Sequence, residues 1–310
     1  MKIAHLSDIH ILSTTGHGWR EFLNKRLAGG ANVLVNRRAN YKNQAAFDVV
    51  RDMNARGGFD HVCITGDLTS LALGAEFRIA RELLDGIAGG RQRVSLIPGN
   101  HDYYTRSSER AHDFERTFAD FMTSDLDLGG APFPFVHLRG EAAFIGLSSG
   151  LATGWLLAYG KLGEAQLGAL DRALAHPALE GKARVVLLHH PPVKHSMLHA
   201  GRALRDAAAL GEVLRARGAE LVLHGHEHND LAYAIPGPAG PDAIPVRGVP
   251  SASYVGKREY RHARWHIYEL ARRGGPRPVL VGREVRQYRP SDSTFMDVQP
   301  VPLGVSELKT

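Results

Sequence analysis

Aspartate, asparagine and histidine residues gather in five short motifs along the chain. The motifs are Asp8-Ile9-His10, Gly66-Asp67, Gly99-Asn100-His101-Asp102, His189-His190-Pro191-Pro192 and His224-Gly225-His226-Glu227-His228. Carboxylate and amide oxygens mixed with neutral imidazoles suit Mn²⁺, Fe, Zn²⁺ or Co²⁺ better than Ca²⁺. Because this set exceeds one tetrahedral site, it predicts two ions about 3.5–4 Å apart that share a bridging carboxylate and activate a water.

Each motif follows a short apolar run that is typical of a buried strand. The runs cover residues 2–7, 61–65, 94–98, 185–188 and 220–223, with a further one at 142–147. Amphipathic stretches that favour helices lie between them, at 43–56, 75–87, 108–122, 164–175 and 205–217. This alternation predicts an α/β fold. Ligands of open α/β sheets bind beyond the carboxyl ends of the strands, so we expect the motifs to meet there.

The sequence after Asn229 has a different texture. Short strand candidates separated by Gly and Pro indicate antiparallel strands, at 232–235, 244–248, 252–255, 265–269 and 279–285. The polar, proline-punctuated end predicts an extended tail over 286–310, which leaves one domain over 1–285.

The five motifs, in this order, resemble those of the calcineurin-like metallophosphoesterases over roughly residues 1–270. The resemblance implies a four-layer αββα sandwich with a dinuclear metal site. It assigns Asp8, His10 and His228 to one ion, Asn100, His189 and His226 to the other, and Asp67 to the bridge. His189 is preferred over His190 because the family's ligand directly follows its strand.

The resemblance also implies two residues that act beside the metals. His101 is expected to contact the substrate phosphate and assist the leaving group, and Asp102 is expected to orient His101. The lone cysteine, Cys63, lies mid-strand and is expected in the core, so the reaction needs no covalent nucleophile.

Two departures point to one branch of the family. Residues 66–72 lack the Gly-Asp-x-x-Asp-Arg-Gly motif of the protein phosphatases, and Asn100-His101-Asp102 replaces their Asn-His-Glu. Both favour a bacterial phosphodiesterase that hydrolyses a cyclic nucleotide or a glycerophosphodiester. A pyrophosphohydrolase of the UDP-diacylglucosamine type, a broad phosphomonoesterase and a non-catalytic scaffold stay open as alternatives, although none of the seven ligand positions is lost.

The net charge of +6 over 310 residues favours anionic partners. Basic residues concentrate in 20–42, within a long segment over 11–42 that follows the first strand. This segment is interpreted as a substrate cap, a contact with an anionic membrane surface, or a solvated helix. Trp19, Tyr103 and His195 are expected to contact a small phosphate-ester substrate. A nucleic-acid substrate is not expected, and the chain is interpreted as a monomer or homodimer.

Two features of the chain bear on its compartment. A single cysteine excludes an internal disulfide and fits a reducing environment. The aliphatic runs are far shorter than a bilayer span, and Asp8 interrupts the apolar N-terminal stretch. We therefore expect a cytoplasmic protein, with peripheral membrane contact through 20–42 as a possibility.

Overall fold

Two six-stranded sheets form the centre of this computed structural model, which describes residues 1–13, 38–154, 157–193, 201–238 and 240–302. The first sheet has the order β12-β11-β10-β1-β2-β3 and the second the order β4-β5-β6-β7-β9-β8. The strands of the first sheet are β1 (Lys2–Leu6), β2 (His61–Ile64), β3 (Val94–Leu96), β10 (Arg264–Arg272), β11 (Pro278–Arg289) and β12 (Thr294–Val298). The strands of the second are β4 (Phe135–Arg139), β5 (Ala142–Gly146), β6 (Ala183–Leu187), β7 (Leu221–His224), β8 (Leu231–Gly237) and β9 (Gly240–Gly248).

Parallel strands make up the part of each sheet that leads into the motifs. Strands β1, β2 and β3 are parallel, as are β5, β6, β7 and β9, whereas β4, β8, β10, β11 and β12 pair antiparallel. The predicted antiparallel strands after residue 229 are therefore present, but they are divided between the two sheets.

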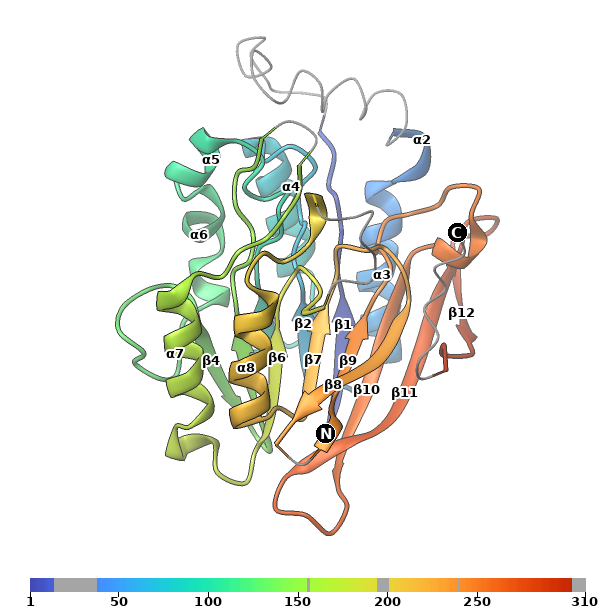
Figure 1. Cartoon of the computed structure of the whole chain (residues 1–310). Helices are drawn as coiled ribbons and strands as arrows, with labels where there is room; N and C mark the ends of the chain where they lie inside the picture. Colours follow the sequence, from blue (N-terminus) through green and yellow to red (C-terminus); the bar gives the residue numbers. More distant parts are fainter. Residues whose placement is uncertain (14–37, 155–156, 194–200, 239, 303–310) are drawn as a thin grey trace.

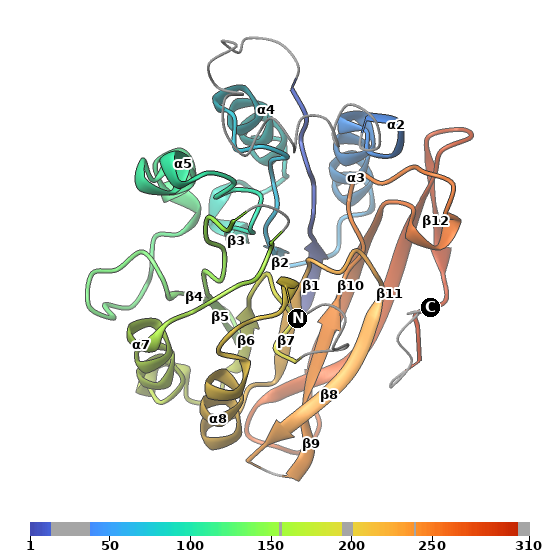
Figure 2. The ribbon, with the colours of Figure 1, turned by 45° about the horizontal axis from the view of Figure 1, so that its top comes forward.

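Helices cover the outer face of each sheet (Figure 1). The main helices are α3 (Asn43–Arg56) and α4 (Gly74–Asp85) on the first sheet and α7 (Glu164–Leu174) and α8 (Ala207–Arg217) on the second. Shorter ones are α2 (Arg38–Asn40), α5 (Arg106–Arg110) and α6 (Asp113–Phe118), with 3-10 turns at Arg91–Arg93, Ala119–Phe121, Pro177–Leu179 and Glu259–Arg261. The view in Figure 2 separates the two helical layers from the sheets between them.

Alternating side chains of the buried strands build the layers. In β6, Val185 and Leu187 join the core that includes Leu6 of the first sheet. The residues between them point the other way, and Val186 packs in the core formed with Leu210 of α8. A strand that is apolar on both faces requires a layer on each side. This arrangement confirms the predicted four-layer αββα sandwich.

The predicted tail is the clearest correction to the sequence-based fold. Residues 286–298 complete β11 and form β12, which pair with each other. Tyr288 is buried, its hydroxyl donates to Asp48 of α3, and Arg286 forms an ion pair with Asp52 of the same helix. The polar side chains that suggested a tail are instead the partners of acids on α3.

Three smaller predictions also change. Residues 252–255 form a loop with isolated bridges rather than a strand, and β4 was not predicted. The helix expected at 108–122 is divided into α5, α6 and a 3-10 turn, because His112 adopts a left-handed backbone with a φ of 50°. Within the part of the chain that the structure describes, no helix is both long and apolar enough to cross a membrane.

Candidate metal centre

The segment after β1 and the loop after β2 run side by side and bring the first three candidate ligands together. The N–H of Asp8 donates to the carbonyl of Gly66 at 2.9 Å, and the N–H of His10 donates to that of Asp67 at 2.9 Å. These main-chain bonds extend the parallel pairing of β1 and β2 beyond the regular strands. Asp8, His10 and Asp67 therefore lie at one edge of the first sheet.

Left-handed backbone is concentrated at this edge. Among the described residues, eight other than glycine have positive φ, and five of these are candidate ligands. Their φ values are 54° for Asp8, 50° for His10, 54° for Asp67, 69° for His226 and 52° for His228. Residues with side chains rarely adopt this conformation, and such strain persists where the surrounding structure holds a functional geometry.

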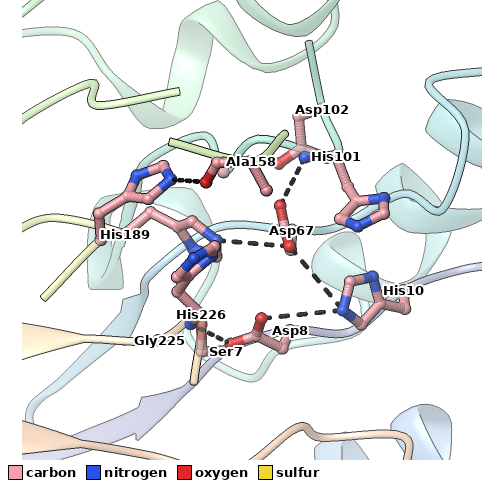
Figure 3. A network of polar contacts seen from close by, with 12 residues as sticks. Ser7, Asp8, His10, Asp67, His101, Asp102, Ala158, His189, Gly225 and His226 are labelled. Atoms are coloured by element: carbon pink, nitrogen blue, oxygen red, sulfur yellow. Dashed lines mark hydrogen bonds and ion pairs between the residues drawn. The ribbon is translucent and has the colours of Figure 1, made fainter. Parts of the chain in front are cut away.

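The two carboxylates share one arrangement. Asp8 accepts the N–H of His226 through Oδ2 at 3.0 Å, and Asp67 accepts the N–H of His101 through Oδ1 at 2.7 Å. The other oxygen of each carboxylate faces imidazoles. Oδ1 of Asp8 lies 3.0 Å from Nε2 of His228, and Oδ2 of Asp67 lies 3.3 Å from Nε2 of His189. One oxygen of each thus fixes a neighbouring loop, and the second is directed into the site (Figure 3).

His10 connects the two carboxylates. Its Nε2 lies 3.7 Å from Oδ1 of Asp8, 3.8 Å from Oδ2 of Asp67 and 3.1 Å from Nε2 of His228. Figure 3 shows the ring of His10 on one side of the two carboxylates and His226 on the other. Asp8, His10 and His228 form one group whose candidate ligand atoms all lie within 4.8 Å, and Asp8, Asp67 and His189 form another. The two groups share Asp8, and Asp67 lies between them.

Hydrogen bonds to one ring nitrogen leave the other free on three histidines. His189 Nδ1 is 2.6 Å from the carbonyl of Thr65, which leaves Nε2 directed at Asp67. His226 Nε2 is 3.1 Å from the carbonyl of Arg202, which leaves Nδ1 as its candidate ligand atom. His228 Nδ1 is 2.9 Å from the hydroxyl of Tyr41. Metal-binding histidines are commonly oriented by such a bond to the nitrogen that does not bind.

Buried polar atoms without a hydrogen bond provide the test of whether a metal fits. Among the described side chains, Oδ1 of Asp8, Oδ1 of Asn100 and Nε2 of His189 are buried and have no hydrogen-bond partner. Unpaired buried polar atoms are costly and therefore rare. All three carry lone pairs that a cation would accept, and all three are predicted ligands. The donor set therefore fits a metal centre.

The neighbouring His190 is engaged elsewhere. Its Nδ1 lies 2.8 Å from the hydroxyl of Ser149 and its Nε2 lies 3.0 Å from the carbonyl of Ala158. Both ring nitrogens thus have structural partners, whereas Nε2 of His189 has none among the described residues. This difference supports the choice of His189 as the ligand.

The charges of the site depend on each other. Burial alone would raise the pKa of Asp67, but His189, His101 and His10 hold it well below its ordinary value. Burial alone would lower the pKa of His189, but Asp67 and Asp8 raise it to about 9. A metal ion must displace the proton of His189, so we expect metal affinity to increase as the pH rises toward 9.

His101 borders the site without belonging to its centre. Its Nδ1 lies 2.7 Å from the carbonyl of Ser70, and its ring packs edge-on against His10 with centroids 4.9 Å apart. One of its ring nitrogens is within 4.8 Å of the candidate ligand atoms of His10 and Asp67. The ring is close enough to contact either a substrate or a metal, so its predicted role beside the substrate stays a prediction.

Asp102 holds the loops together and is a correction to its predicted role. Its carboxylate accepts the N–H groups of Gly99 at 2.9 Å, Leu68 at 3.2 Å and Thr69 at 3.0 Å. The ring of His101 is held by a main-chain carbonyl instead. Burial and the charge of Asp67 raise the pKa of Asp102 to about 7. Asp102 therefore joins the loops that carry Asp67 and Asn100 and lies outside the reaction.

The predicted substrate contacts fare differently. Tyr103 is buried in the core and its hydroxyl donates to Glu115 at 2.5 Å, so it does not face the site. Its neighbour Tyr104 stacks on His101 with centroids 5.4 Å apart. The strand–loop junction moves the expected position by one residue. Trp19 and His195 lie outside the described residues.

Two supporting features were missed in the sequence. Tyr41 contacts His228, and the hydroxyl of Ser251 donates to the carbonyl of Asp8 at 2.5 Å. Tyr41 carries no motif signal, although its position directly before a predicted helix is visible in the sequence. Gly225 is explained by close approach, because a Cβ there would collide with Ser7 and Asp8. Cys63 is buried and its thiol pKa is raised by burial, which confirms its place in the core.

Comparison with known proteins gives a matching family and relatives. The family model of the calcineurin-like phosphoesterases matches residues 1–230. A cAMP/cGMP dual specificity phosphodiesterase of Mycobacterium tuberculosis is 28% identical over 230 residues, which are 73% of this chain and 61% of that protein. The match thus spans less than two thirds of this relative's length.

Solved structures show the same fold at low sequence identity. A dimetal phosphatase from Danio rerio matches with a TM-score of 0.54 and 12% identity, over 86% of this chain and 91% of that one. PhoD matches with a TM-score of 0.51 and 11% identity, over 98% of this chain and 72% of that one. Together with the family match over residues 1–230, the fold and the converging motifs lead to one conclusion: the chain belongs to the calcineurin-like phosphoesterase family.

Proposed function

We propose that this phosphoric ester hydrolase is a dinuclear metal-dependent phosphodiesterase that acts on a small nucleotide diester such as a cyclic nucleotide. We assign Asp8, His10 and His228 to one ion and Asn100, His189 and His226 to the other, with Asp67 between them. The identity of the metals is left to Mn²⁺, Fe, Zn²⁺ or Co²⁺, which accept this mixture of oxygen and nitrogen ligands.

One observation carries the proposal. Asp8 and Asp67 are buried, and their ion-pair partners among the described residues are histidines, with no arginine or lysine. Two buried carboxylates without a fixed cation leave negative charge that a metal pair would neutralise. The unpaired oxygens and nitrogen described above are where such ions would bind.

The chain's own residues then have separable roles. Two bound ions supply an activated water and neutralise charge on the phosphate. The main-chain bonds from His226 to Asp8 and from His101 to Asp67 keep the carboxylates in place, so that the site is organised in advance. His101, at the rim, would contact a phosphate oxygen and hold the proton that the departing oxygen needs.

The preference for a diester has support from sequence and from charge. The Gly-Asp-x-x-Asp-Arg-Gly motif of the protein phosphatases is absent from residues 66–72, and the relative described above is a cyclic-nucleotide phosphodiesterase. A metal pair alone would favour the dianion of a monoester over the monoanion of a diester. The walls of the site must therefore hold the second ester group, and Tyr104, beside His101, is the nearest described aromatic ring.

The test compares kcat/KM of the metal-loaded protein on four substrates: bis-p-nitrophenyl phosphate, p-nitrophenyl phosphate, cyclic AMP and a UDP-sugar lipid. We expect hydrolysis of the diesters, with the cyclic nucleotide preferred to the monoester. Metal-free protein and Asp67→Ala serve as blanks.

Two other outcomes would replace the proposal. Faster hydrolysis of the monoester than of every diester would indicate a phosphomonoesterase. Turnover of the UDP-sugar lipid alone would indicate a pyrophosphohydrolase. Absence of turnover on all four substrates, in a protein shown to bind its metals, would contradict a phosphodiesterase function for the chain.

A further inference from the structure

We propose that Tyr41 is a positioning residue of the metal centre, which fixes the ring of His228 and links the end of the basic 11–42 segment to one ion. The inference rests on the proposed metal centre. Tyr41 belongs to none of the five motifs and reaches the site from the residue pair between α2 and α3.

The contact fixes which nitrogen of His228 is available. The hydroxyl oxygen of Tyr41 lies 2.9 Å from Nδ1 of His228. The opposite nitrogen, Nε2, lies 3.0 Å from Oδ1 of Asp8 and 3.1 Å from Nε2 of His10. If Nδ1 carries the hydrogen and donates it to the Tyr41 oxygen, the lone pair of Nε2 is directed into the site. This is the tautomer that a metal ion requires.

The ring of Tyr41 also packs against the ligands. It meets His228 edge-on with centroids 5.8 Å apart and an interplanar angle of 74°, and it meets His10 at 5.6 Å and 83°. Edge-to-face packing at these distances stabilises one relative orientation of the rings. Tyr41 therefore restrains two histidines that we assign to the same ion.

His228 differs from the other histidines in the kind of partner that orients it. His189 and His226 are held by the main-chain carbonyls of Thr65 and Arg202. The side chain of His228 is 15% exposed, whereas those of His10 and His189 are fully buried. Because packing restrains His228 less, its orientation depends more on the hydrogen bond from a side chain, which a single substitution can remove.

Tyr41 is itself held by the loop that supports Asp8. Residues Tyr41 and Tyr254 form an antiparallel bridge, and their rings pack edge-on at 5.3 Å. The N–H of Lys42 donates to the carbonyl of Ser253 at 2.9 Å, and the N–H of Val255 donates to that of Asn40 at 2.7 Å. The end of the 11–42 segment is thus attached to the rim of the site, and a change at this attachment would be transmitted to His228.

The test is the replacement Tyr41→Phe, which removes the hydroxyl and keeps the ring. The matched control is Tyr254→Phe, which removes a hydroxyl from the neighbouring ring. Metal-free wild type and both variants are titrated with Mn²⁺ against a competing chelator, and their melting temperatures are measured without metal. Loss of a residue that orients a metal ligand typically weakens affinity about 10–100-fold.

We expect Tyr41→Phe to weaken the binding of one of two ions about 10–100-fold, with its metal-free melting temperature close to that of wild type. Excess Mn²⁺ should restore most of kcat, and Tyr254→Phe should bind Mn²⁺ as wild type does. Equal affinities in wild type and Tyr41→Phe would overturn the role of Tyr41 and leave the proposed function intact. A wild type that binds no Mn²⁺ at all would overturn the proposed metal centre itself.

Discussion

Two groups of buried charges lie close together in this molecule and are balanced in opposite ways. Asp230, two residues after His228, forms an ion pair with Arg283 and has Arg264 at 3.6 Å. His266 is nearby at 3.9 Å, and its pKa is held well below the ordinary value by burial and by Arg283. This acid therefore has fixed cations from the protein.

The metal centre lacks such partners. The acids Asp8 and Asp67 face imidazoles, and the ligand atoms around them include buried ones without hydrogen bonds. Backbone strain is also confined to this group, since Asp230 is absent from the described residues with positive φ whereas both of these acids have φ of 54°. The comparison teaches that burial of an acid does not by itself indicate a site. A buried acid without a fixed cation, on a strained backbone, does.

The largest effect should come from Asp67→Ala. The carboxylate lies between both groups of candidate ligands, so its loss removes a ligand from each ion. We expect activity to fall by more than about 10⁴-fold, beyond the usual contribution of acid–base catalysis. The rise in melting temperature on addition of Mn²⁺ should also vanish. Full activity of this variant, or of verified metal-free wild type, would contradict the assignment.

His101→Ala should separate chemistry from metal binding. If His101 acts on the substrate, kcat should fall by roughly 10²–10⁴-fold while the metal content measured by mass spectrometry stays near that of wild type. A variant purified with one ion fewer would show instead that His101 is a ligand, which its distance from His10 and Asp67 permits.

Asp230→Asn probes the balanced group. Its removal leaves Arg283 buried without its ion pair, which typically costs about 3–5 kcal/mol of unfolding free energy. We expect urea denaturation to show this loss, and Mn²⁺ still to raise the melting temperature of the variant. The double variant Asp230→Asn with Arg283→Met should recover part of the stability. Unchanged stability of the single variant would remove the contrast between the two groups.

A smaller effect concerns Glu76, whose carboxylate accepts the N–H groups of Leu71 at 2.8 Å and Leu73 at 3.3 Å. Burial raises its pKa from 4.5 to about 7. The folded state therefore binds this proton more tightly than the unfolded state, so the stability contribution is complete below pH 4.5 and declines as the pH rises through 7. We expect the decline to amount to about 1–3 kcal/mol.

Urea denaturation of metal-free wild type and Glu76→Gln at several pH values between 5 and 8.5 measures this decline. The variant should lose less stability than wild type as the pH rises. Parallel curves for the two proteins would show that Glu76 keeps an ordinary pKa.

Much of the centre could be predicted because its chemistry is local in the sequence. The seven ligands follow apolar runs directly, so strand ends and side-chain types are visible together, as at Asp8 and His189. The four-layer fold follows from strands that are apolar on both faces. The partners of these residues were not visible, because Tyr41 meets His228 across 187 positions and Arg286 meets Asp52 across 234. Such pairs depend on register and tertiary packing, which the local pattern of residues does not encode.

Electron paramagnetic resonance of metal-free protein titrated with Mn²⁺ tests the central claim most directly. A pair of ions bridged by Asp67 should bind in a ratio of two per chain and give the signal of magnetically coupled Mn²⁺. The same titration of Asp67→Ala should give isolated ions or none, and that of Asp230→Asn should retain the coupled signal. Binding of a single uncoupled ion by wild type, or a coupled signal that survives Asp67→Ala, would contradict the account.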